Sequence, residues 1–419
     1  MRLAWLSSRQ VQRRLLISLI VSALTFWCLL PRRKHELKPA NLEERYPLLW
    51  RHVHAFNGSG GAWYIPPNWL SSAGVQPENI VDAALLASQV TSANRHRHIE
   101  HSSIPLLLHQ TWKNRRVDTW SDLLRLSVEK WLRYVVSDDM AYFFWEDDGV
   151  LQMLDEFEPD FVEQFRSLPS NVERADVFRI LVLKWFGGIY ADVDTQPLRR
   201  PSSWLSPSDL APWTDPVTNS KFSSDNAVSI VLGIEADCPP DKDDYWRMGY
   251  SHPVQLTQWA LASSSGHPIL LHFMDTLQRR LNQVANRYGG DLTDMDAAKE
   301  LRQIGPLSLT GPVAITVAAM TWLEEQAGLR WNALTGLFDG GRSKLVDDVL
   351  ILPITGFSPG RRKYGNMGSK PVTDPSARVW HRAQGSWRSF DVKVEYGKFC
   401  RSVFGLCKDW SKQPASVRP

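Results

Sequence analysis

The segment that most constrains how this chain folds covers residues 171–200 and reads NVERADVFRILVLKWFGGIYADVDTQPLRR. A very apolar helical stretch is followed by a Gly187-Gly188 break, a short β-type run and two carboxylates. Because side chains alternate across a strand, we expect Asp192 and Asp194 to project to the same side where the strand ends. Two hard oxygen ligands at the open end of a buried strand suit a Mg²⁺ or Mn²⁺ ion that also holds a diphosphate.

The helix in front of the D-x-D pair is expected to be buried on most sides, because residues 172–186 leave little polar surface. Asp176 and Arg179 nevertheless lie inside it, three positions apart and therefore on one face. Burying such a pair costs more than it returns unless partners satisfy both charges. Two interpretations stay open: a structural ion pair, or two side chains that reach a polar ligand at the same place as Asp192.

The pattern around this segment predicts an α/β fold. Apolar runs and helical periods alternate as a strand, a helix, a strand and a helix before the D-x-D block, at residues 104–108, 121–136, 141–145 and 151–166. Strands that alternate with helices imply a mainly parallel central sheet covered on both faces. In such sheets ligands bind beyond the carboxyl ends of the strands. We therefore expect residues 109–112 and 146–148, which follow the first two strands, to converge with Asp192 and Asp194 on one cleft.

Seven segments also occur in the order found in one known family, and together they span roughly residues 100–390. They are IPLLLHQTWK (104–113), the D-x-D region (171–198), GIEAD (233–237), GHPIL (266–270), TGP (310–312), LPITGFSPG (352–360) and HRAQGSW (381–387). With them the chain resembles the glycosyltransferases that carry sugar-binding D-x-D motifs. More narrowly, it is similar to glycosyltransferase family 32, the fungal initiation-specific (outer-chain) α-1,6-mannosyltransferase group. The resemblance implies a GT-A-type nucleotide-sugar-binding fold.

The resemblance also assigns roles to individual residues. Asp194 matches the second aspartate of the family's D-x-D motif and is expected to contact the metal directly. Asp192 would contact the metal partly through water, or bind the sugar and ribose hydroxyls. Asp176 and Arg179 match the pair that holds the donor sugar. Because the leaving diphosphate develops charge, Mn²⁺ (or Mg²⁺) is the expected cofactor, and Asp192 and Asp194 are the expected catalytic residues.

Three further residues are candidates for the donor and metal sites. Trp112 resembles the aromatic residue that packs on the donor base, with a core tryptophan as the alternative, and His109 lies at the same strand end. His381 occupies the family's C-terminal H…GSW position and would complete the metal or diphosphate site, with a structural histidine as the alternative. The basic, glycine-rich stretch 361–370 fits either a lid over phosphate or a solvated loop.

The expected reaction is retaining, metal-dependent transfer of mannose from GDP-mannose to N-linked glycan cores or mannan of glycoproteins. Other Golgi mannosyltransferases are expected partners in a complex. One alternative is a mannosyltransferase acting on inositol phosphoceramide sphingolipid, but relatives of that type carry extra C-terminal hydrophobic spans, and the charged tail after Trp387 has none. A second alternative is a non-catalytic glycan-binding protein with the same fold. The intact D-x-D pair and the Asp176 and Arg179 pair argue against it.

Residues 15–30 form an uncharged apolar run with basic residues on both sides. Pro31 and a basic run follow it where a cleaved signal peptide would have small residues, so we expect a signal anchor. The expected protein is a single-pass type II Golgi membrane protein with a lumenal catalytic domain. Its expected parts are a cytoplasmic tail, a transmembrane anchor, a stem with a lead-in, a GT-A catalytic domain and a C-terminal tail, at residues 1–14, 15–31, 32–100, 101–395 and 396–419.

Composition agrees with a lumenal enzyme. Asn57 begins the one N-x-S/T sequon of the chain and is the expected glycosylation site, just after the anchor. Cys400 and Cys407 are close enough to form a disulfide in an oxidising lumen, which would leave Cys238 as a thiol, although the connectivity stays open. A net charge of +3 and the absence of a basic patch with interleaved aromatic residues give no reason to expect nucleic acid.

Overall fold

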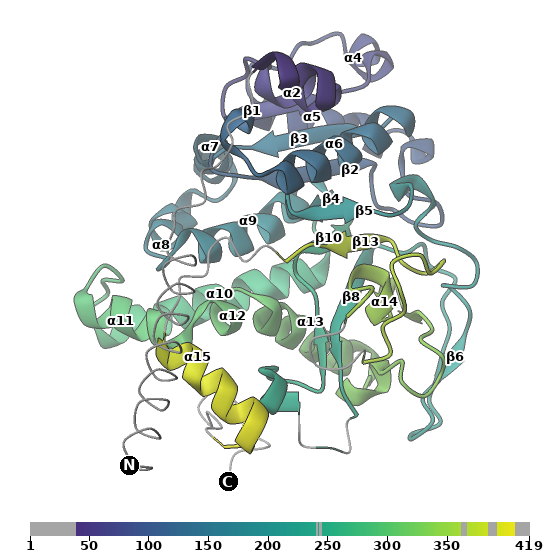
Figure 1. Cartoon of the computed structure of the whole chain (residues 1–419), viewed down its shortest axis with the longest axis vertical. Coiled ribbons are helices and arrows are strands. Elements are labelled where there is room, and N and C mark those ends of the chain that lie inside the picture. The colour runs from purple at the N-terminus through teal and green to yellow at the C-terminus, as the bar shows by residue number, and fades with distance from the viewer. Residues whose placement is uncertain (1–38, 240–241, 243–244, 362–366, 384–391, 407–419) are drawn as a thin grey trace, which may run out of the picture.

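The computed structural model describes residues 39–239, 242, 245–361, 367–383 and 392–406. Within these residues, nine strands form one sheet that crosses the molecule between layers of helices (Figure 1). The strand order is β1 (Gly61–Tyr64), β3 (Ala141–Trp145), β2 (Leu107–Thr111), β4 (Gly188–Ala191), β10 (Ala260–Ser263), β8 (Ile230–Asp237), β12 (Val349–Leu352) and β11 (Lys344–Val346), and β9 (Val254–Leu256) pairs with the end of β8. The α/β fold class is therefore confirmed.

The sheet is mixed, so the prediction of a mainly parallel sheet is wrong. β2 pairs in parallel with β3 and β4, and β8 pairs in parallel with β12. β1, β9, β10 and β11 each run antiparallel to their neighbours. β10 matters most because it lies between β4 and β8 and runs against both. β9 and β10 follow one another in the chain and both run back along β8, β9 beside its end and β10 beside its beginning. No α-helix of the described residues lies between β8 and β10, so the strand–helix alternation that implies parallel strands does not hold for this return.

Helices cover both faces of the sheet, and each face buries its own apolar cluster. One face is covered by α4 (Pro67–Ala73), α5 (Ile80–Ser92), α7 (Asp147–Phe157), α8 (Val162–Arg166), α9 (Asn171–Phe186), α10 (Pro268–Arg287), α11 (Met295–Ile304), α12 (Pro306–Leu309) and α13 (Pro312–Ala327). The other is covered by α2 (Pro39–Arg45), α3 (Pro47–Leu49), α6 (Asp122–Ser137) and α14 (Ile354–Phe357). Figure 1 shows α9 and α10 side by side.

The helix predicted in front of the D-x-D pair is α9. Ser170 caps its first turn by accepting a hydrogen bond from Val172 N, and Gly187 ends it with a φ of 69°. Gly188 follows with a φ of 100°, and a Cβ at this position would lie 2.6 Å from Leu107 O of β2. Only glycine tolerates both conditions. The glycine pair therefore lets a buried helix turn directly into β4 beside β2.

Residues 39–100 are packed into the folded body, which differs from the loosely packed lead-in expected from the sequence. Leu42 and Leu49 are buried in the same cluster as α6, and Leu49 N donates to Glu129 Oε2 of α6 at 2.9 Å. β1 adds an antiparallel edge strand to β3. α2, α3 and β1 are short, and a short helix or strand contains too few residues to show a hydrophobic period. Sequence periodicity therefore missed them.

Most of the predicted elements around the site are present. α6 and β3 match the predicted 121–136 and 141–145 to within one residue. β2 begins three residues later than predicted and extends to Thr111. The predicted helix 151–166 is split into α7 and α8, because Pro159 starts a 3-10 turn between them. The interruption does not move the strands that carry the site.

Among the described residues, Pro306–Ala327 is the one stretch long and apolar enough to cross a membrane, and half of its most apolar window is buried. Within it, α13 contributes Ile315, Ala319 and Leu323 to the core, all fully buried. The core helix of a soluble domain passes the same test of length and composition. The predicted anchor at residues 15–31 lies outside the described residues.

The C-terminal part has one confirmed disulfide cysteine. α15 (Val392–Phe399) leads into Cys400, which is disulfide-bonded, and the expected partner Cys407 lies outside the described residues. Cys238 is buried at the end of β8 and donates its thiol hydrogen to Met367 Sδ at 3.8 Å. The prediction that Cys238 stays a thiol is confirmed.

Candidate active site

The D-x-D pair lies in a turn between two strands. β4 ends at Ala191, and both the amide and the hydroxyl of Thr195 donate to Asp192 O, at 2.9 and 2.6 Å, where β5 (Thr195–Pro197) begins. The expected strand alternation is therefore not what brings the two carboxylates together; the turn is. Gln110 of β2 supports it by donating from Nε2 to Ala191 O at 3.1 Å.

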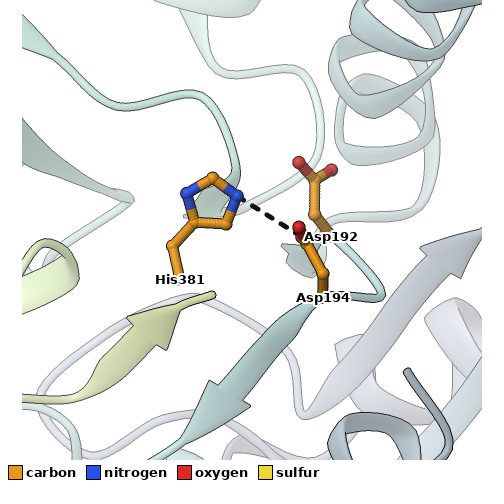
Figure 2. A group of neighbouring side chains, drawn as sticks. All are labelled: Asp192, Asp194 and His381. Carbon is orange, nitrogen blue, oxygen red and sulfur yellow. Dashed lines mark ion pairs between the residues drawn. The ribbon is translucent and has the colours of Figure 1, made fainter. Parts of the chain in front are cut away.

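His381 joins the two aspartates because β5 pairs with β13 (Val379–His381), with Thr195 opposite His381. His381 Nε2 lies 3.3 Å from Asp194 Oδ1. One ligand atom from each of Asp192, Asp194 and His381 lies within 4.8 Å of the others. Figure 2 shows the three side chains as neighbours, with the ion pair between His381 and Asp194 as a dashed line. The structure thus brings together the three residues that the sequence nominates as metal ligands.

The three side chains fit a divalent cation. Their side chains are 26%, 15% and 23% exposed for Asp192, Asp194 and His381, so the cluster is reachable from solvent. Carboxylate oxygens and an imidazole nitrogen form a ligand set that Mn²⁺ accepts, and Mg²⁺ would use the oxygens. His381 is held by stacking on Trp259, with ring centroids 4.5 Å apart. Trp259 is fixed in turn by donating from Nε1 to Phe357 O at 3.0 Å.

The Asp176 and Arg179 pair of α9 lies directly behind this cluster. Arg179 Nη2 is 3.1 Å from Asp176 Oδ1 and 3.2 Å from Asp192 Oδ1, so one guanidinium nitrogen is shared by two carboxylates. Tyr190 donates its hydroxyl to Asp192 Oδ1 at 2.8 Å, and the Arg179 guanidinium lies over the Tyr190 ring. The pair is thus both buried and connected to the D-x-D turn, a combination that neither sequence interpretation described.

Negative charge exceeds positive charge in this group of side chains. Burial raises the pKa of Asp176 to about 7, and Arg179 opposes that rise only in part. Burial also raises the pKa of Asp192, and the neighbouring Asp194 adds to the effect. Within the described residues, Arg179 Nε has no hydrogen-bond partner. A cation held by Asp192 and Asp194 would favour the ionised carboxylates, which is the condition a metal site needs.

The prediction that His109 binds the donor is wrong. His109 is fully buried, with Nδ1 accepting from Trp145 Nε1 at 3.2 Å and Nε2 3.1 Å from Gly187 O. Burial lowers its pKa to about 3, so the ring is neutral and donates from Nε2 to Gly187 O. His109 points toward α9, two residues before the strand ends, and serves the core. A sequence pattern gives the end of a strand, but not which residues remain inside the sheet.

The positions of Trp112, Asn57 and Arg361 are compatible with the roles expected from the sequence. Trp112 directly follows β2, is partly exposed, and its amide donates to Trp145 O at 3.2 Å, so its role as a platform for the donor base stays a prediction. Asn57 is exposed in the loop before β1. Arg361, the first residue of the basic stretch, lies over the Trp259 ring and donates to Tyr250 Oη at 2.9 Å. Residues 362–366 and the GSW motif lie outside the described residues.

Sequence reasoning missed four residues of the site. Tyr190 and Trp259 contact the D-x-D turn or His381, and Gln258 and Thr310 contact the Asp176 and Arg179 pair. Tyr190 could have been found from the sequence, since it lies on β4, the short strand that leads directly into the D-x-D pair. Thr310 belongs to the TGP segment, whose role was not assigned. The other two carry no local signal, because the turn before β10 reaches the site only through the antiparallel return of the chain.

Comparison with known proteins places these residues in a recurring context. A family model described as "Glycosyltransferase sugar-binding region containing DXD motif" matches residues 121–211, which include α6, α9 and the D-x-D turn. The initiation-specific α-1,6-mannosyltransferase of Saccharomyces cerevisiae is 34% identical over 385 residues, covering 68% of this chain and 78% of that protein.

Two further relatives come from Schizosaccharomyces pombe. Its initiation-specific α-1,6-mannosyltransferase is 32% identical over 295 residues, which cover 69% of this chain but 65% of that protein. Its inositol phosphoceramide mannosyltransferase 3 is 30% identical over only 122 residues, or 27% of this chain and 33% of that protein. The long matches are therefore to proteins named for α-1,6 transfer, and the short match is to one named for sphingolipid transfer.

Proposed function

Since this chain belongs to the family of glycosyltransferases whose sugar-binding region contains a DXD motif, we propose that it is an α-1,6-mannosyltransferase that uses GDP-mannose. Its acceptors are N-linked glycan cores or mannan of glycoproteins. The observation that carries the proposal is the cluster of Asp192, Asp194 and His381 beside the shared Arg179 guanidinium. The parallel strands β3, β2 and β4, with the D-x-D turn at their carboxyl edge, support a GT-A-type fold.

Each residue has a distinct task in this proposal. Asp194, Asp192 and His381 hold a divalent ion, Mn²⁺ or Mg²⁺, which when bound neutralises charge on the leaving diphosphate. Arg179 and Asp176 orient the mannosyl group, the guanidinium by donating and the carboxylate by accepting hydrogen bonds from hydroxyls. Trp112 packs against the guanine base. His381 keeps its orientation through the stack on Trp259.

Transfer proceeds with retention in this proposal. The bond between the mannose anomeric carbon and the diphosphate oxygen breaks with its electron pair going to the diphosphate. The acceptor hydroxyl oxygen then bonds to the same face of the oxocarbenium-like carbon, and its proton passes to the departing diphosphate oxygen. No described carboxylate is assigned as a covalent nucleophile, so Asp176 and Asp192 act by charge and orientation.

A donor and acceptor panel tests the proposal. The purified full-length chain, in detergent, is incubated with nucleotide sugars, with and without Mn²⁺, and with either a mannose-rich N-glycan or inositol phosphoceramide as acceptor. We expect mannose transfer from GDP-mannose to the glycan, only with the divalent ion present, and an α-1,6 linkage by product NMR. Transfer to the sphingolipid alone would favour the alternative acceptor. Glycan binding without transfer or donor hydrolysis would leave a glycan-binding protein.

The proposal includes a type II orientation in the Golgi membrane, anchored by residues 15–31 and with the catalytic domain in the lumen. The exposed position of Asn57 in the loop before β1 is compatible with a glycan there. In sealed microsomes we expect the domain to resist added protease, and Asn57→Gln to remove one glycan's mass. Complete digestion without detergent contradicts this orientation. Co-purification with other Golgi mannosyltransferases would test the expected complex.

A further inference from the structure

Thr310 is a fully buried residue between α12 and α13 that reaches the site from a distant part of the chain. Its Oγ1 donates to Asp176 Oδ2 at 3.1 Å, across 134 positions of sequence. The other oxygen of the same carboxylate, Asp176 Oδ1, faces Arg179. Among the described residues, Thr310 and Arg179 are the two side chains bonded to this carboxylate. Thr310 therefore holds Asp176 Oδ2, the carboxylate oxygen that Arg179 does not pair with.

Gln258 ties the same junction to the turn before β10. It is fully buried, and its Nε2 donates to Thr310 O at 2.6 Å. Its own main-chain oxygen accepts from Arg179 Nη1 at 2.9 Å. Three elements thus meet at the pair on α9: the junction of α12 and α13, the turn before β10, and the D-x-D turn. Gln258 contacts Thr310 and Arg179, whereas the hydroxyl of Thr310 contacts the Asp176 carboxylate itself.

The position of Asp176 decides how Arg179 is divided between two acids. Arg179 Nη2 lies at nearly equal distances from Asp176 Oδ1 and Asp192 Oδ1, 3.1 and 3.2 Å. If Asp176 moves away, the guanidinium is left to Asp192 alone and competes there with a cation. We propose that Thr310 is a positioning residue that holds the Asp176 carboxylate, keeps Arg179 shared, and so keeps Asp192 available to a divalent cation.

This inference rests on the proposed sugar transfer but is tested by three measurements, two of which need no substrate. The variants are Thr310→Val, which removes the hydroxyl, and Thr310→Ser, which keeps it. The matched control is Thr316→Val on α13, because Thr316 is equally buried and its Oγ1 accepts from Leu256 N at 2.9 Å and donates to Pro312 O at 2.6 Å, not to either residue of the acidic pair. Each full-length variant is assayed for Mn²⁺ affinity by calorimetry, for kcat and KM with GDP-mannose, and for melting temperature.

We expect Thr310→Val to weaken Mn²⁺ binding and to lower kcat, each by about tenfold, as the loss of a residue that supports metal ligands usually does. Thr310→Ser should recover both to within about threefold, and Thr316→Val should change only the melting temperature. The inference is overturned if Thr310→Val and Thr316→Val lose the same stability and neither loses Mn²⁺ affinity or turnover. It is also overturned if the serine variant is as impaired as the valine variant. A wild type inactive with every nucleotide sugar would instead refute the proposed function, while Mn²⁺ affinity still decides the role of Thr310.

Discussion

Two buried arginine–aspartate groups in this protein have opposite character. In the first, all three guanidinium nitrogens of Arg378, which precedes β13, donate hydrogen bonds within the protein. Nη2 donates to both carboxylate oxygens of Asp209 at 2.8 Å, Nε donates to Trp204 O, and Nη1 donates to Ser376 O. At the second, Arg179 shares one nitrogen between Asp176 and Asp192, and its Nε has no partner among the described residues.

The pKa values of the acids follow this difference. Burial would raise the pKa of Asp209, but the Arg378 guanidinium and hydrogen bonds from Ser343 and Ser206 hold it below its usual range. Burial raises the pKa of Asp176 to about 7, and Arg179, which is shared with Asp192, lowers it only in part. The Arg378 group is complete within the protein and stabilises the fold. The Arg179 group has surplus acid, and a bound cation and donor are what would complete it.

The sharpest division between the groups should come from Asp194→Ala. Removing this carboxylate takes away a candidate metal ligand without unpairing a buried arginine, so turnover should fall by about a thousandfold or more. The melting temperature should stay within a few degrees. Steady-state kinetics and calorimetry on the full chain measure both, with the exposed Asp155→Ala as control. Full activity of the wild type in excess EDTA contradicts the metal role.

Arg378→Ala should show the reverse pattern. It leaves Asp209 buried without its guanidinium, and the expected loss is about 3–5 kcal/mol of unfolding free energy. Specific activity of the folded fraction should remain within about threefold of wild type. Denaturant titration monitored by tryptophan fluorescence gives the first quantity. Arg279→Ala is the control, because Arg279 pairs with Asp275 at the surface, where both side chains are more than half exposed, and should lose about 0–1 kcal/mol. A stable but inactive Arg378→Ala protein would break the comparison.

Asp176→Asn and Asp209→Asn form a matched pair of substitutions. Asp176→Asn removes a charge that burial already disfavours and keeps the shape, so unfolding free energy should change by about 1 kcal/mol or less, while transfer falls by about a hundredfold. Asp209→Asn should destabilise by about 3 kcal/mol with little effect on specific activity. If Asp176→Asn is markedly unstable yet active in proportion to its folded fraction, Asp176 and Arg179 are a structural pair.

The smallest expected effect is a difference in how stability depends on pH. Because the folded pKa of Asp176 is raised to about 7 from 3.8, its contribution is fully present below pH 3.8 and is lost as pH rises through about 7. Asp209 has a lowered pKa, so its contribution is present above pH 3.8 and is lost as pH falls through the lowered value. Without metal, the melting temperature of wild type relative to Asp176→Asn should fall by a few degrees from pH 4 to pH 8. A difference in melting temperature between wild type and Asp176→Asn that does not change with pH contradicts the raised pKa of Asp176.

Local patterns predicted the elements that carry the site. Ser121 at the start of α6, the apolar residues of β3 and the glycine pair after α9 each act on neighbours in the chain, and these elements match the prediction. His109 shows the limit of such patterns, since a histidine near a strand end looks the same whether it faces a ligand or the core. Its burial depends on Phe143, Trp145 and the end of α9, which come from elsewhere in the chain.

The sequence by itself determined that Asp176, Arg179, Asp192 and Asp194 lie close together, because one helix, two glycines and one short strand connect them, and it left open whether the helix pair is structural or binds a ligand. It also nominated His381 through a family motif. Only the tertiary structure decided that β10 runs against β4, that the turn before it brings Trp259 and Gln258 to the acids, and that Thr310 holds Asp176. Local sequence sets helices, turns and strand ends through short-range sterics and hydrogen bonds. Which distant side chain satisfies a buried charge depends on how the whole sheet packs.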